Sequence, residues 1–261
     1  MNILEVKDLR TYFYTSYGVV KPVDGVSFNM QRNKVFGIVG ESGSGKTLAA
    51  LSILKLVPFP GRIEGGQAVF NGINLLDTDE GVLRSIRGSK ISFVFQEPAS
   101  CFNPVFTMGE QIIEAIIAHH DIGKEEARER TLHYLEKARI DEPERIFYAY
   151  PHQLSGGTKQ RAAIAMALVN SPELVILDEP TTALDVTIQA QILDMLEDLI
   201  RKENLSVLFI SHDFRVIGRM CDTVAVMYKG RIVESGDVKE VLTNPKAEYT
   251  ASLLDSVKAL S

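Results

Sequence analysis

The sequence has no tryptophan, only two cysteines and no long apolar run. Cys101 and Cys221 lie far apart and form no CxxC pair, which excludes the usual cysteine spacings of zinc sites. Two isolated thiols are typical of a reducing compartment, and we expect both to be small buried apolar side chains. No window approaches the roughly 18 apolar residues of a membrane-spanning helix, and no basic and apolar leader follows Met1. Any action on a membrane is therefore expected to pass through partner proteins.

An excess of basic residues is also missing. The 261 residues include 28 lysines and arginines against 34 aspartates and glutamates, and the net charge of −6 argues against a general nucleic-acid partner. Hydrophobic residues make up 45% and charged residues 24%, as in an ordinary soluble globular protein. A chain of this length can bury a large core without disulfides or metals, in one large domain or two small ones.

Short apolar runs alternate with helical patterns along much of the chain. Such runs are typical of strands buried in a parallel sheet. The alternation predicts an α/β fold with a mostly parallel sheet. The predicted strands are residues 34–39, 91–95, 174–177 and 207–210, and the helices that follow or separate them are residues 47–56, 154–170 and 188–203.

Antiparallel strands are expected beside this sheet. Residues 1–35 and 62–75 are rich in β-forming residues separated by turn residues. Residues 224–227 and 231–234 flank Lys229-Gly230, which predicts a hairpin after the core.

A helical subdomain is expected within the core. Residues 107–120 and 124–137 are helical, and the stretch from about 104 to 170 shows no clear strand. We therefore divide the chain into an α/β core with its antiparallel subdomain, at approximately 1–95 and 171–261, and a helical insertion at approximately 96–170.

A glycine-rich loop joins the first buried strand to a helix. It matches GxxxxGK[ST] at every fixed position, in the strand–loop–helix context of a phosphate-binding loop. Glycines let the backbone wrap closely, so that its amides and the positive end of the helix can bind phosphate oxygens. Lys46 would add a charge for the β- and γ-phosphates of ATP, and the Thr47 hydroxyl could ligate Mg²⁺. The loop consists of Gly40, Glu41, Ser42, Gly43, Ser44, Gly45, Lys46 and Thr47.

Two acidic residues follow the strand at 174–177. The carboxyl ends of parallel strands face the ligand crevice, so Asp178 fits the role of a Mg²⁺ ligand. Adjacent strand residues point to opposite faces unless the strand has ended, so Glu179 is expected to act differently. It is the candidate general base for the attacking water, a role that contributes ~10²–10⁴-fold to a rate. The alternative is an acidic pair that caps a helix before Pro180.

A second anion-binding helix start is predicted at Ser155, Gly156 and Gly157, within the segment LSGGTKQR. A single ATP does not obviously need two such sites from one chain. Two copies of the chain facing head to tail would use both, because each copy would complete the site of the other.

With these motifs the sequence resembles the ATP-binding cassette (ABC) superfamily, whose signature is usually LSGGQ. The other family motifs follow in order along nearly the whole chain. The resemblance implies that Gln96 contacts Mg²⁺ and the attacking water, that Asp185 of Ala183-Leu184-Asp185 lies at the dimer interface, and that His212 contacts the γ-phosphate. The implied catalytic residues are Glu179, His212, Gln96 and Lys46, and the implied Mg²⁺ ligands are Thr47, Gln96 and Asp178.

The family also has an aromatic residue that stacks on adenine. Tyr17 lies 23 positions before Gly40, where the family places this residue, and Tyr12 and Tyr14 are the alternatives.

Longer phrases are similar to the branch that takes up oligopeptides, dipeptides and nickel. They are Gln96-Glu97-Pro98 with Asn103-Pro104, residues 178–191, and Asn244-Pro245, Tyr249-Thr250 and Leu253-Leu254. The resemblance implies an ATP-hydrolysing importer subunit, peripheral on the cytoplasmic side of the cell membrane. Its implied partners are a second ABC ATPase, identical or paralogous, two integral membrane permeases and an extracytoplasmic solute-binding protein. Peptides, nickel or a related small solute remain open as cargo.

Three departures from the branch concern its partners. Cys101-Phe102 stands where the branch often has Ser-Leu, near the membrane-subunit contact of relatives, so partner fit is expected to differ. Thr158-Lys159 replaces the commoner Met-Arg or Gln-Arg, while Ser-Gly-Gly is intact. Peptide-transporting members often carry a cysteine-bearing extension, whereas this sequence stops at Ser261. Whether that extension was removed or never present stays open, and no iron–sulfur role is expected.

Other classes share some of these motifs. Soluble ABC ATPases of DNA repair and chromosome structure place a long coiled coil between the glutamine and the signature, whereas Gln96 and Leu154 are only 58 positions apart. Translation-type members usually carry two cassettes in one chain. A P-loop kinase or GTPase would lack LSGG and the histidine, and a non-catalytic regulatory cassette would be expected to have lost Lys46, Glu179 or His212.

Overall fold

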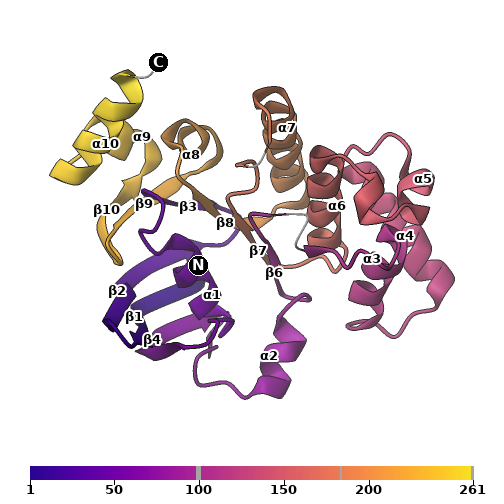
Figure 1. Ribbon diagram of the computed structural model, residues 1–261, viewed down its shortest axis with the longest axis horizontal. Coiled ribbons are helices and arrows are strands. Elements are labelled where there is room, and N and C mark those ends of the chain that lie inside the picture. Colours follow the sequence, from indigo (N-terminus) through magenta and orange to yellow (C-terminus); the bar gives the residue numbers. More distant parts are fainter. Residues whose placement is uncertain (98–100, 183, 260–261) are drawn as a thin grey trace. The chain divides into compact units, whose positions relative to one another are not determined.

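The computed structural model describes residues 1–97, 101–182 and 184–259, so Pro98 and Ala183 lie outside the described residues. Within these ranges the backbone forms unit 1, residues 1–83 and 206–261, and unit 2, residues 84–205 (Figure 1). The core and insertion boundaries expected from the sequence stay a prediction. None of the described helices combines the length and the apolar character needed to cross a bilayer.

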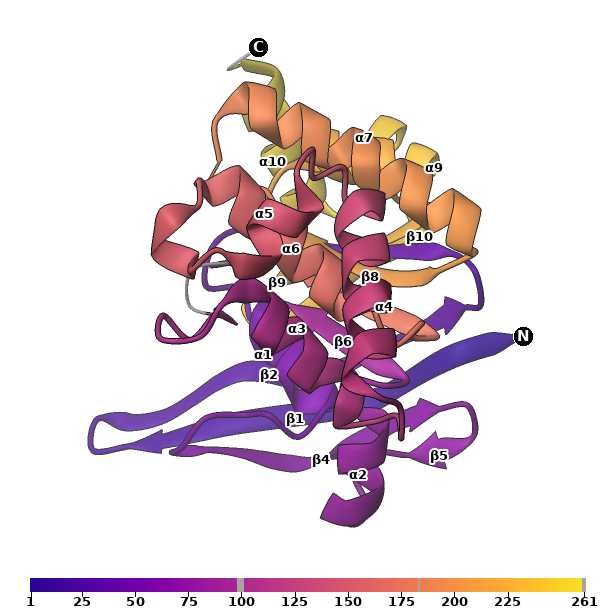
Figure 2. The ribbon, with the colours of Figure 1, turned by 90° about the vertical axis from the view of Figure 1, so that its right-hand side faces the viewer.

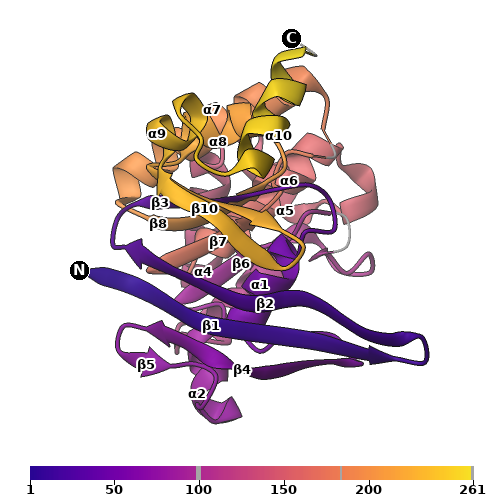
Figure 3. The same ribbon diagram turned by 90° about the vertical axis from the view of Figure 1, so that its left-hand side faces the viewer.

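An antiparallel sheet occupies the first part of unit 1. β1 (Asn2–Thr15) pairs on one side with β2 (Gly18–Gln31) and on the other with β4 (Gly61–Phe70), and β5 (Ile73–Asn74) pairs with β4. Figures 2 and 3 show the long strands side by side, with α1 (Lys46–Ile53) next to them. The antiparallel strands predicted for this part of the chain are confirmed.

Parallel strands form the second sheet of unit 1. β3 (Val35–Val39) is buried along its whole length and runs parallel to β8 (Ser206–Ser211) and to β9 (Thr223–Tyr228). A strand covered on both faces needs a continuous apolar run, which this sequence supplies. β10 (Arg231–Asp237) pairs antiparallel with β9, which confirms the predicted hairpin. The other helices of unit 1 are α8 (Phe214–Met220), α9 (Val238–Thr243) and α10 (Glu248–Ala259), and α2 (Glu80–Ile86) crosses the sequence boundary between the units.

Unit 2 combines one parallel strand pair with helices. β6 (Ile91–Val94) and β7 (Leu174–Asp178) run parallel. Residues 104–170 are all described and contain helices and turns but no strand, as predicted. Figure 2 shows α3 to α6 as one group. The helices are α3 (Met108–Ile117), α4 (Lys124–Lys137), α5 (Pro143–Tyr148), α6 (Gly156–Leu168) and α7 (Val186–Glu203), with a 3₁₀ turn at Pro151–Gln153.

The start of α3 shows how local sequence fixes a helix end. Thr107 accepts a hydrogen bond from the Glu110 amide at 3.3 Å, and the Glu110 carboxylate accepts one from the Thr107 amide at 2.8 Å. This reciprocal arrangement satisfies amides that have no partner inside the helix. The Thr107 amide and hydroxyl hold the pKa of Glu110 below its ordinary value.

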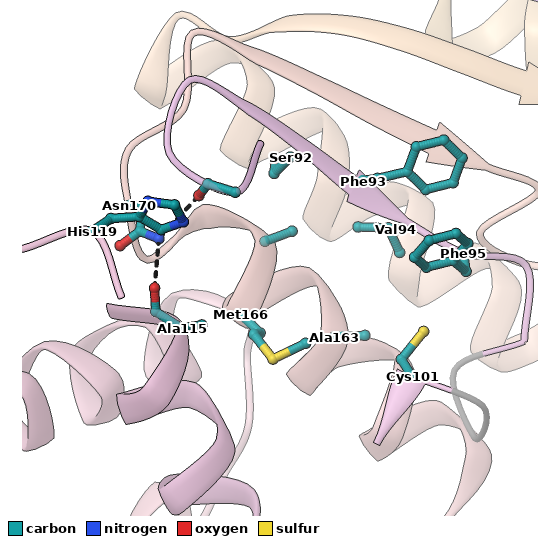
Figure 4. A pocket seen from close by; sticks show the side chains of 12 residues that line it. Ser92, Phe93, Val94, Phe95, Cys101, Ala115, His119, Ala163, Met166 and Asn170 are labelled. Atoms are coloured by element: carbon teal, nitrogen blue, oxygen red, sulfur yellow. Dashed lines mark hydrogen bonds between the residues drawn. The ribbon is translucent and has the colours of Figure 1, made fainter. Parts of the chain in front are cut away.

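Asn170 connects three parts of unit 2 through hydrogen bonds. It follows α6 and is 8% exposed. Its Nδ2 donates to the carbonyl oxygens of Gly88, before β6, and of Ala115, in α3, both at 2.9 Å (Figure 4). One amide therefore holds a turn and a helix against the end of α6.

Replacing Asn170 by alanine is expected to lower the free energy of unfolding by about 2 kcal/mol, because two carbonyl oxygens lose their donor in a partly buried place. Urea denaturation followed by circular dichroism measures this change. Asn170→Asp is the matched variant, which keeps the size but loses the amide donor, and it is expected to lose at least as much. Losses below about 0.5 kcal/mol in both variants would show that Asn170 does not hold these elements.

Candidate functional site

The phosphate loop of unit 1 lies between β3 and α1. Gly43 and Gly45 have φ angles of +79° and +106°, which side chains rarely tolerate. A Cβ on Gly45 would overlap the carbonyl oxygen of Pro22 in β2, and one on Gly40 would overlap that of Met227 in β9. The loop can therefore follow this path only with glycine at both positions.

Lys46 and Ser44 are the buried polar side chains of this loop. Lys46 is 4% exposed, and its Nζ donates to the carbonyl oxygens of Gly40 at 2.8 Å and Glu41 at 2.9 Å. These contacts offset the cost of burying an ammonium group. The Ser44 hydroxyl is buried and has no hydrogen-bond partner. A buried positive charge and an unpaired hydroxyl in a loop closed by glycines fit a phosphate group.

His212 directly follows β8 in unit 1 and is exposed. The Ser211 hydroxyl accepts a hydrogen bond from the Asp213 amide at 3.0 Å, and Asp213 caps α8 by accepting one from the Arg215 amide at 2.8 Å. These two side chains fix the turn that presents His212 at the end of the strand.

The three candidate tyrosines differ in exposure. Tyr17 is fully exposed in the turn between β1 and β2, so its ring is open to a stacking partner. Tyr12 donates a hydrogen bond to Asp24 at 2.7 Å, and Tyr14 is 47% exposed. Tyr17 thus remains the candidate for adenine.

The acidic pair lies in unit 2 where β7 ends. Asp178 is the last strand residue and is 2% exposed. Glu179 has a φ of +45°, which is uncommon for a residue with a side chain and is a type of strain found often at functional sites. Its Oε2 accepts hydrogen bonds from Gln96 Nε2 at 3.3 Å and from Thr182 Oγ1 at 2.9 Å. The structure therefore brings together Glu179 and Gln96, which are far apart in sequence.

Thr182 is a site residue that the sequence analysis missed. Its position three residues after Glu179, in a turn where the Thr182 amide donates to the Glu179 carbonyl at 3.3 Å, is the only sequence-local signal for this contact. The result is a carboxylate with one oxygen held by two donors.

Two other predicted site residues cap helices in unit 2. Ser155 precedes α6, and its Oγ accepts a hydrogen bond from the Thr158 amide at 3.2 Å and lies 2.9 Å from Thr158 Oγ1. Asp185 precedes α7 and accepts a hydrogen bond from the Ile188 amide at 3.0 Å. Thr158, at which this sequence departs from the branch, thus takes part in the cap of α6.

The starts of α6 and α7 touch each other. A Cβ on Gly157 would lie 2.7 Å from Ile188 Cγ2, and one on Gly156 would lie 3.5 Å from Leu184 Cδ2. Because Cγ2 is attached directly to Cβ, Ile188 cannot move it far without changing rotamer. Gly157 therefore leaves room for Ile188 in the first turn of α7.

Arg161 fastens α6 further along the signature segment. Its Nη1 donates to the carbonyl oxygen of Ala138 at 3.2 Å, and its Nη2 donates to Gln191 Oε1 of α7 at 3.2 Å. Burial is the main cause that lowers the pKa of this guanidinium from its ordinary value. An arginine remains charged at neutral pH even so, and its charge strengthens these hydrogen bonds.

The two cysteines differ from one another. Cys221 is buried, as expected, and burial raises the pKa of its thiol. Cys101 is only half-buried, and its Sγ lies 3.6 Å from the carbonyl oxygen of Glu97. The expectation of two buried apolar thiols is therefore wrong for Cys101, because the chain around it borders a cavity.

This cavity, of about 230 Å³, lies within unit 2 and has a mostly apolar wall (Figure 4). Ser92 Oγ and Asn170 Oδ1 are buried there without hydrogen-bond partners. Burial lowers the pKa of His119, and its neighbour His120 adds to the effect. The side chains labelled around the cavity are Ser92, Phe93, Val94, Phe95, Cys101, Ala115, His119, Ala163, Met166 and Asn170.

A glycine-closed phosphate loop after a buried parallel strand defines a P-loop nucleotide-binding protein. The family model described as "ABC transporter" matches residues 23–182, more than half of the chain. The chain belongs to the ABC transporter family, so the resemblance found in its motifs is confirmed.

Relatives and solved structures agree with this membership. The "Probable peptide ABC transporter ATP-binding protein y4tR" of Sinorhizobium fredii is 47% identical over 98% of this chain and 76% of its own length. The "Oligopeptide transport ATP-binding protein OppD" of Bacillus subtilis is 45% identical over 99% of this chain and 72% of its own length.

Among solved structures, a dimeric post-hydrolysis state of an ATP-binding cassette, bound to ADP and phosphate, has a TM-score of 0.80 at 28% identity. The match covers 90% of this chain and 98% of that one. The cbiO1 protein of Clostridium perfringens has a TM-score of 0.77 at 26% identity, covering 99% and 98%. The predicted fold class, an α/β P-loop ABC ATPase, is confirmed.

The predicted site residues are divided between the units, and their roles toward nucleotide stay predictions. Unit 1 holds Tyr17, the phosphate loop and His212, and unit 2 holds Gln96, Ser155, Gly156, Gly157, Asp178, Glu179 and Asp185.

Gly157→Ala is expected to destabilise the protein by about 1 kcal/mol. The overlap with Ile188 costs about 1–3 kcal/mol, and it outweighs the gain of up to about 1 kcal/mol from placing alanine in a helix. In an Ile188→Ala background the same change is expected to be neutral or stabilising. A double-mutant cycle of unfolding free energies in urea measures this coupling. Equal effects of Gly157→Ala in both backgrounds would show that Ile188 is not the reason for the glycine.

Proposed function

We propose that the chain is the ATP-hydrolysing subunit of an ABC importer and that it works as a dimer of cassettes. One observation carries the proposal: a single chain has both a phosphate loop, in unit 1, and a Ser155-capped, glycine-opened helix start, in unit 2. Two chains arranged head to tail would let each helix start complete the site at the other chain's loop. The dimeric state of the solved cassette with ADP and phosphate supports a dimer of cassettes.

Peptides are the cargo class we propose. Several relatives, at 42–47% identity, bear peptide, oligopeptide or dipeptide transport names. The branch phrases of the sequence point the same way, with nickel or a related solute as the alternative. The proposal implies two permeases, a solute-binding protein and a peripheral position on the cytoplasmic side of the membrane.

The residues proposed for Mg²⁺ have the chemistry that this ion prefers. Thr47 in unit 1, and Gln96 and Asp178 in unit 2, each offer an oxygen atom. Within residues 1–97, 101–182 and 184–259, no cluster of three or more His, Cys, Asp or Glu could hold a metal. When bound, Mg²⁺ would neutralise charge that develops on the phosphate oxygens.

The chain's own residues would position the substrate and move one proton. The loop amides and Lys46 hold the phosphates, and stacking on Tyr17 holds the base. Glu179 accepts the proton of the attacking water at a carboxylate oxygen, while Gln96 and Thr182 fix the direction of that carboxylate. His212 contacts the γ-phosphate from the end of β8. Phosphoryl transfer depends mostly on such positioning and charge stabilisation.

We place the contact with a membrane subunit at the cavity of Figure 4. Its wall includes Phe95, which precedes Gln96, and Cys101, one of the residues at which this sequence departs from the branch. An apolar side chain of a permease loop suits this mostly apolar wall. Such contact would connect the partner with the segment after β6 that carries Gln96.

Glu179→Gln is expected to keep ATP binding but to reduce hydrolysis by ~10²–10⁴-fold, because the amide cannot take a proton from water. The variant is expected to accumulate as an ATP-bound dimer, seen by light scattering during size-exclusion chromatography. Lys46→Ala, as a control, should lose both binding and dimer. Hydrolysis by Glu179→Gln at the wild-type rate would defeat the assignment of the base.

Thr182→Val is expected to lower kcat about three- to tenfold with little change in KM, because it removes one hydrogen bond to the Glu179 carboxylate. Thr182→Ser keeps the hydroxyl and should retain nearly the wild-type kcat. Steady-state ATPase assays measure both variants. An unchanged kcat in Thr182→Val would show that this contact does not matter for catalysis.

A further inference from the structure

The branch phrase that contains Tyr249 lies on α10, in the same unit as the phosphate loop. Glu234 of β10 anchors the turn before this helix, because its carboxylate accepts hydrogen bonds from the amides of Lys246 at 2.7 Å and Ala247 at 3.1 Å. Burial alone would raise the pKa of Glu234, but these amides outweigh it and hold that pKa below its ordinary value. The ionised carboxylate therefore fastens α10 to the β9–β10 hairpin, and Figure 3 shows the helix beside it.

Tyr249 of α10 contacts the last residue before the hairpin turn. Its ring centroid lies 4.0 Å from that of Tyr228, the last residue of β9, with 31° between the ring planes. The Tyr249 hydroxyl is buried and makes no hydrogen bond of good geometry. Burial raises the pKa of this phenol, while the backbone of Glu41, in the phosphate loop, acts in the opposite direction. The contact of its ring with that of Tyr228 is the contact of Tyr249 with the hairpin.

The turn after Tyr228 touches the phosphate loop directly. Lys229 and Gly230 have φ angles of +45° and +83°, as in the two-residue turns that suit a hairpin. The Gly230 amide donates to the Ser44 carbonyl oxygen at 3.0 Å. The Met227 carbonyl lies so close to Gly40 that no Cβ fits there. The hairpin therefore contacts the phosphate loop at two places, Gly40 and Ser44.

We propose that Tyr249 is a positioning residue for nucleotide binding: by stacking on Tyr228 it holds the hairpin turn against the phosphate loop. Docking of α10 then raises the affinity of the loop for ATP. The physical reason is preorganisation, because a loop that is correctly placed for only part of the time binds more weakly by that fraction. The inference rests on the proposed function only in requiring that the chain bind nucleotide.

The coupling must be reciprocal. If the docked helix favours nucleotide binding, bound nucleotide must favour the docked helix by the same factor. ADP is therefore expected to slow hydrogen exchange of the amides of residues 249–256 in the wild-type chain. A tyrosine that contributed only to overall stability would not produce this local, ligand-dependent protection.

The test measures the dissociation constant of the whole chain for a fluorescent ADP analogue with Mg²⁺. Tyr249→Ala is expected to weaken binding about three- to tenfold, the range expected for losing one aromatic pair. Tyr249→Phe keeps the ring and is expected to bind like the wild type. Tyr148→Ala is the matched control, because Tyr148 is a 63% exposed tyrosine on α5 of unit 2.

Glu234→Ala provides a second route to the same result, since it weakens the docking of α10 while both tyrosine side chains and the loop residues are kept. It too is expected to weaken binding severalfold and to abolish the ADP-dependent protection of α10. The inference is overturned if both variants, folded by circular dichroism, bind within about 1.5-fold of the wild type. It is also overturned if Tyr148→Ala weakens binding equally. A wild-type chain that binds the analogue but hydrolyses no ATP would contradict the proposed function without contradicting this inference.

Discussion

The path of the phosphate loop depends on the close approach of backbone to backbone. At Gly40 and Gly45 the chain passes so near to carbonyl oxygens of β9 and β2 that a single added carbon would overlap them. In this path the carbonyl oxygens of Gly40 and Glu41 accept hydrogen bonds from the buried ammonium of Lys46. The hairpin turn, the buried strand β3 and the start of α1 all serve to maintain this path.

In unit 2, the first turns of α6 and α7 also pack closely against each other. Ser155 and Asp185 each cap a helix, and the two first turns meet at Gly157 and Ile188. The start of α6 carries a partial positive charge that suits a phosphate group, whereas the start of α7 is already capped by the carboxylate of Asp185. A rigid contact between them means that a displacement of one is passed to the other, since packed side chains deform little. The same unit also fixes the carboxylate of Glu179 through Gln96 and Thr182.

Much of the fold and the candidate site could be predicted from local patterns. The run KVFGIV predicts β3, the hairpin follows from Lys229-Gly230, and the phosphate loop follows from its glycines and Lys46. The half-exposed Cys101 could not be foreseen, because a cysteine in an apolar phrase is usually buried and no local pattern marks a cavity. The contacts of Thr182 and Tyr249 could not be predicted either. A threonine in a turn and a tyrosine on a helix are common, and only the tertiary structure shows which residues they contact.

The sequence by itself determined the elements, the phosphate-binding chemistry and the family, because strand periodicity, helix caps and glycine-dependent turns are properties of short segments. Only the tertiary structure decided that Gln96 reaches Glu179, that Ile188 needs a glycine at 157, and that the ring of Tyr249 stacks on Tyr228 beside the phosphate loop. Each of these contacts joins residues at least 20 positions apart, and such contacts depend on how whole elements pack rather than on any local preference.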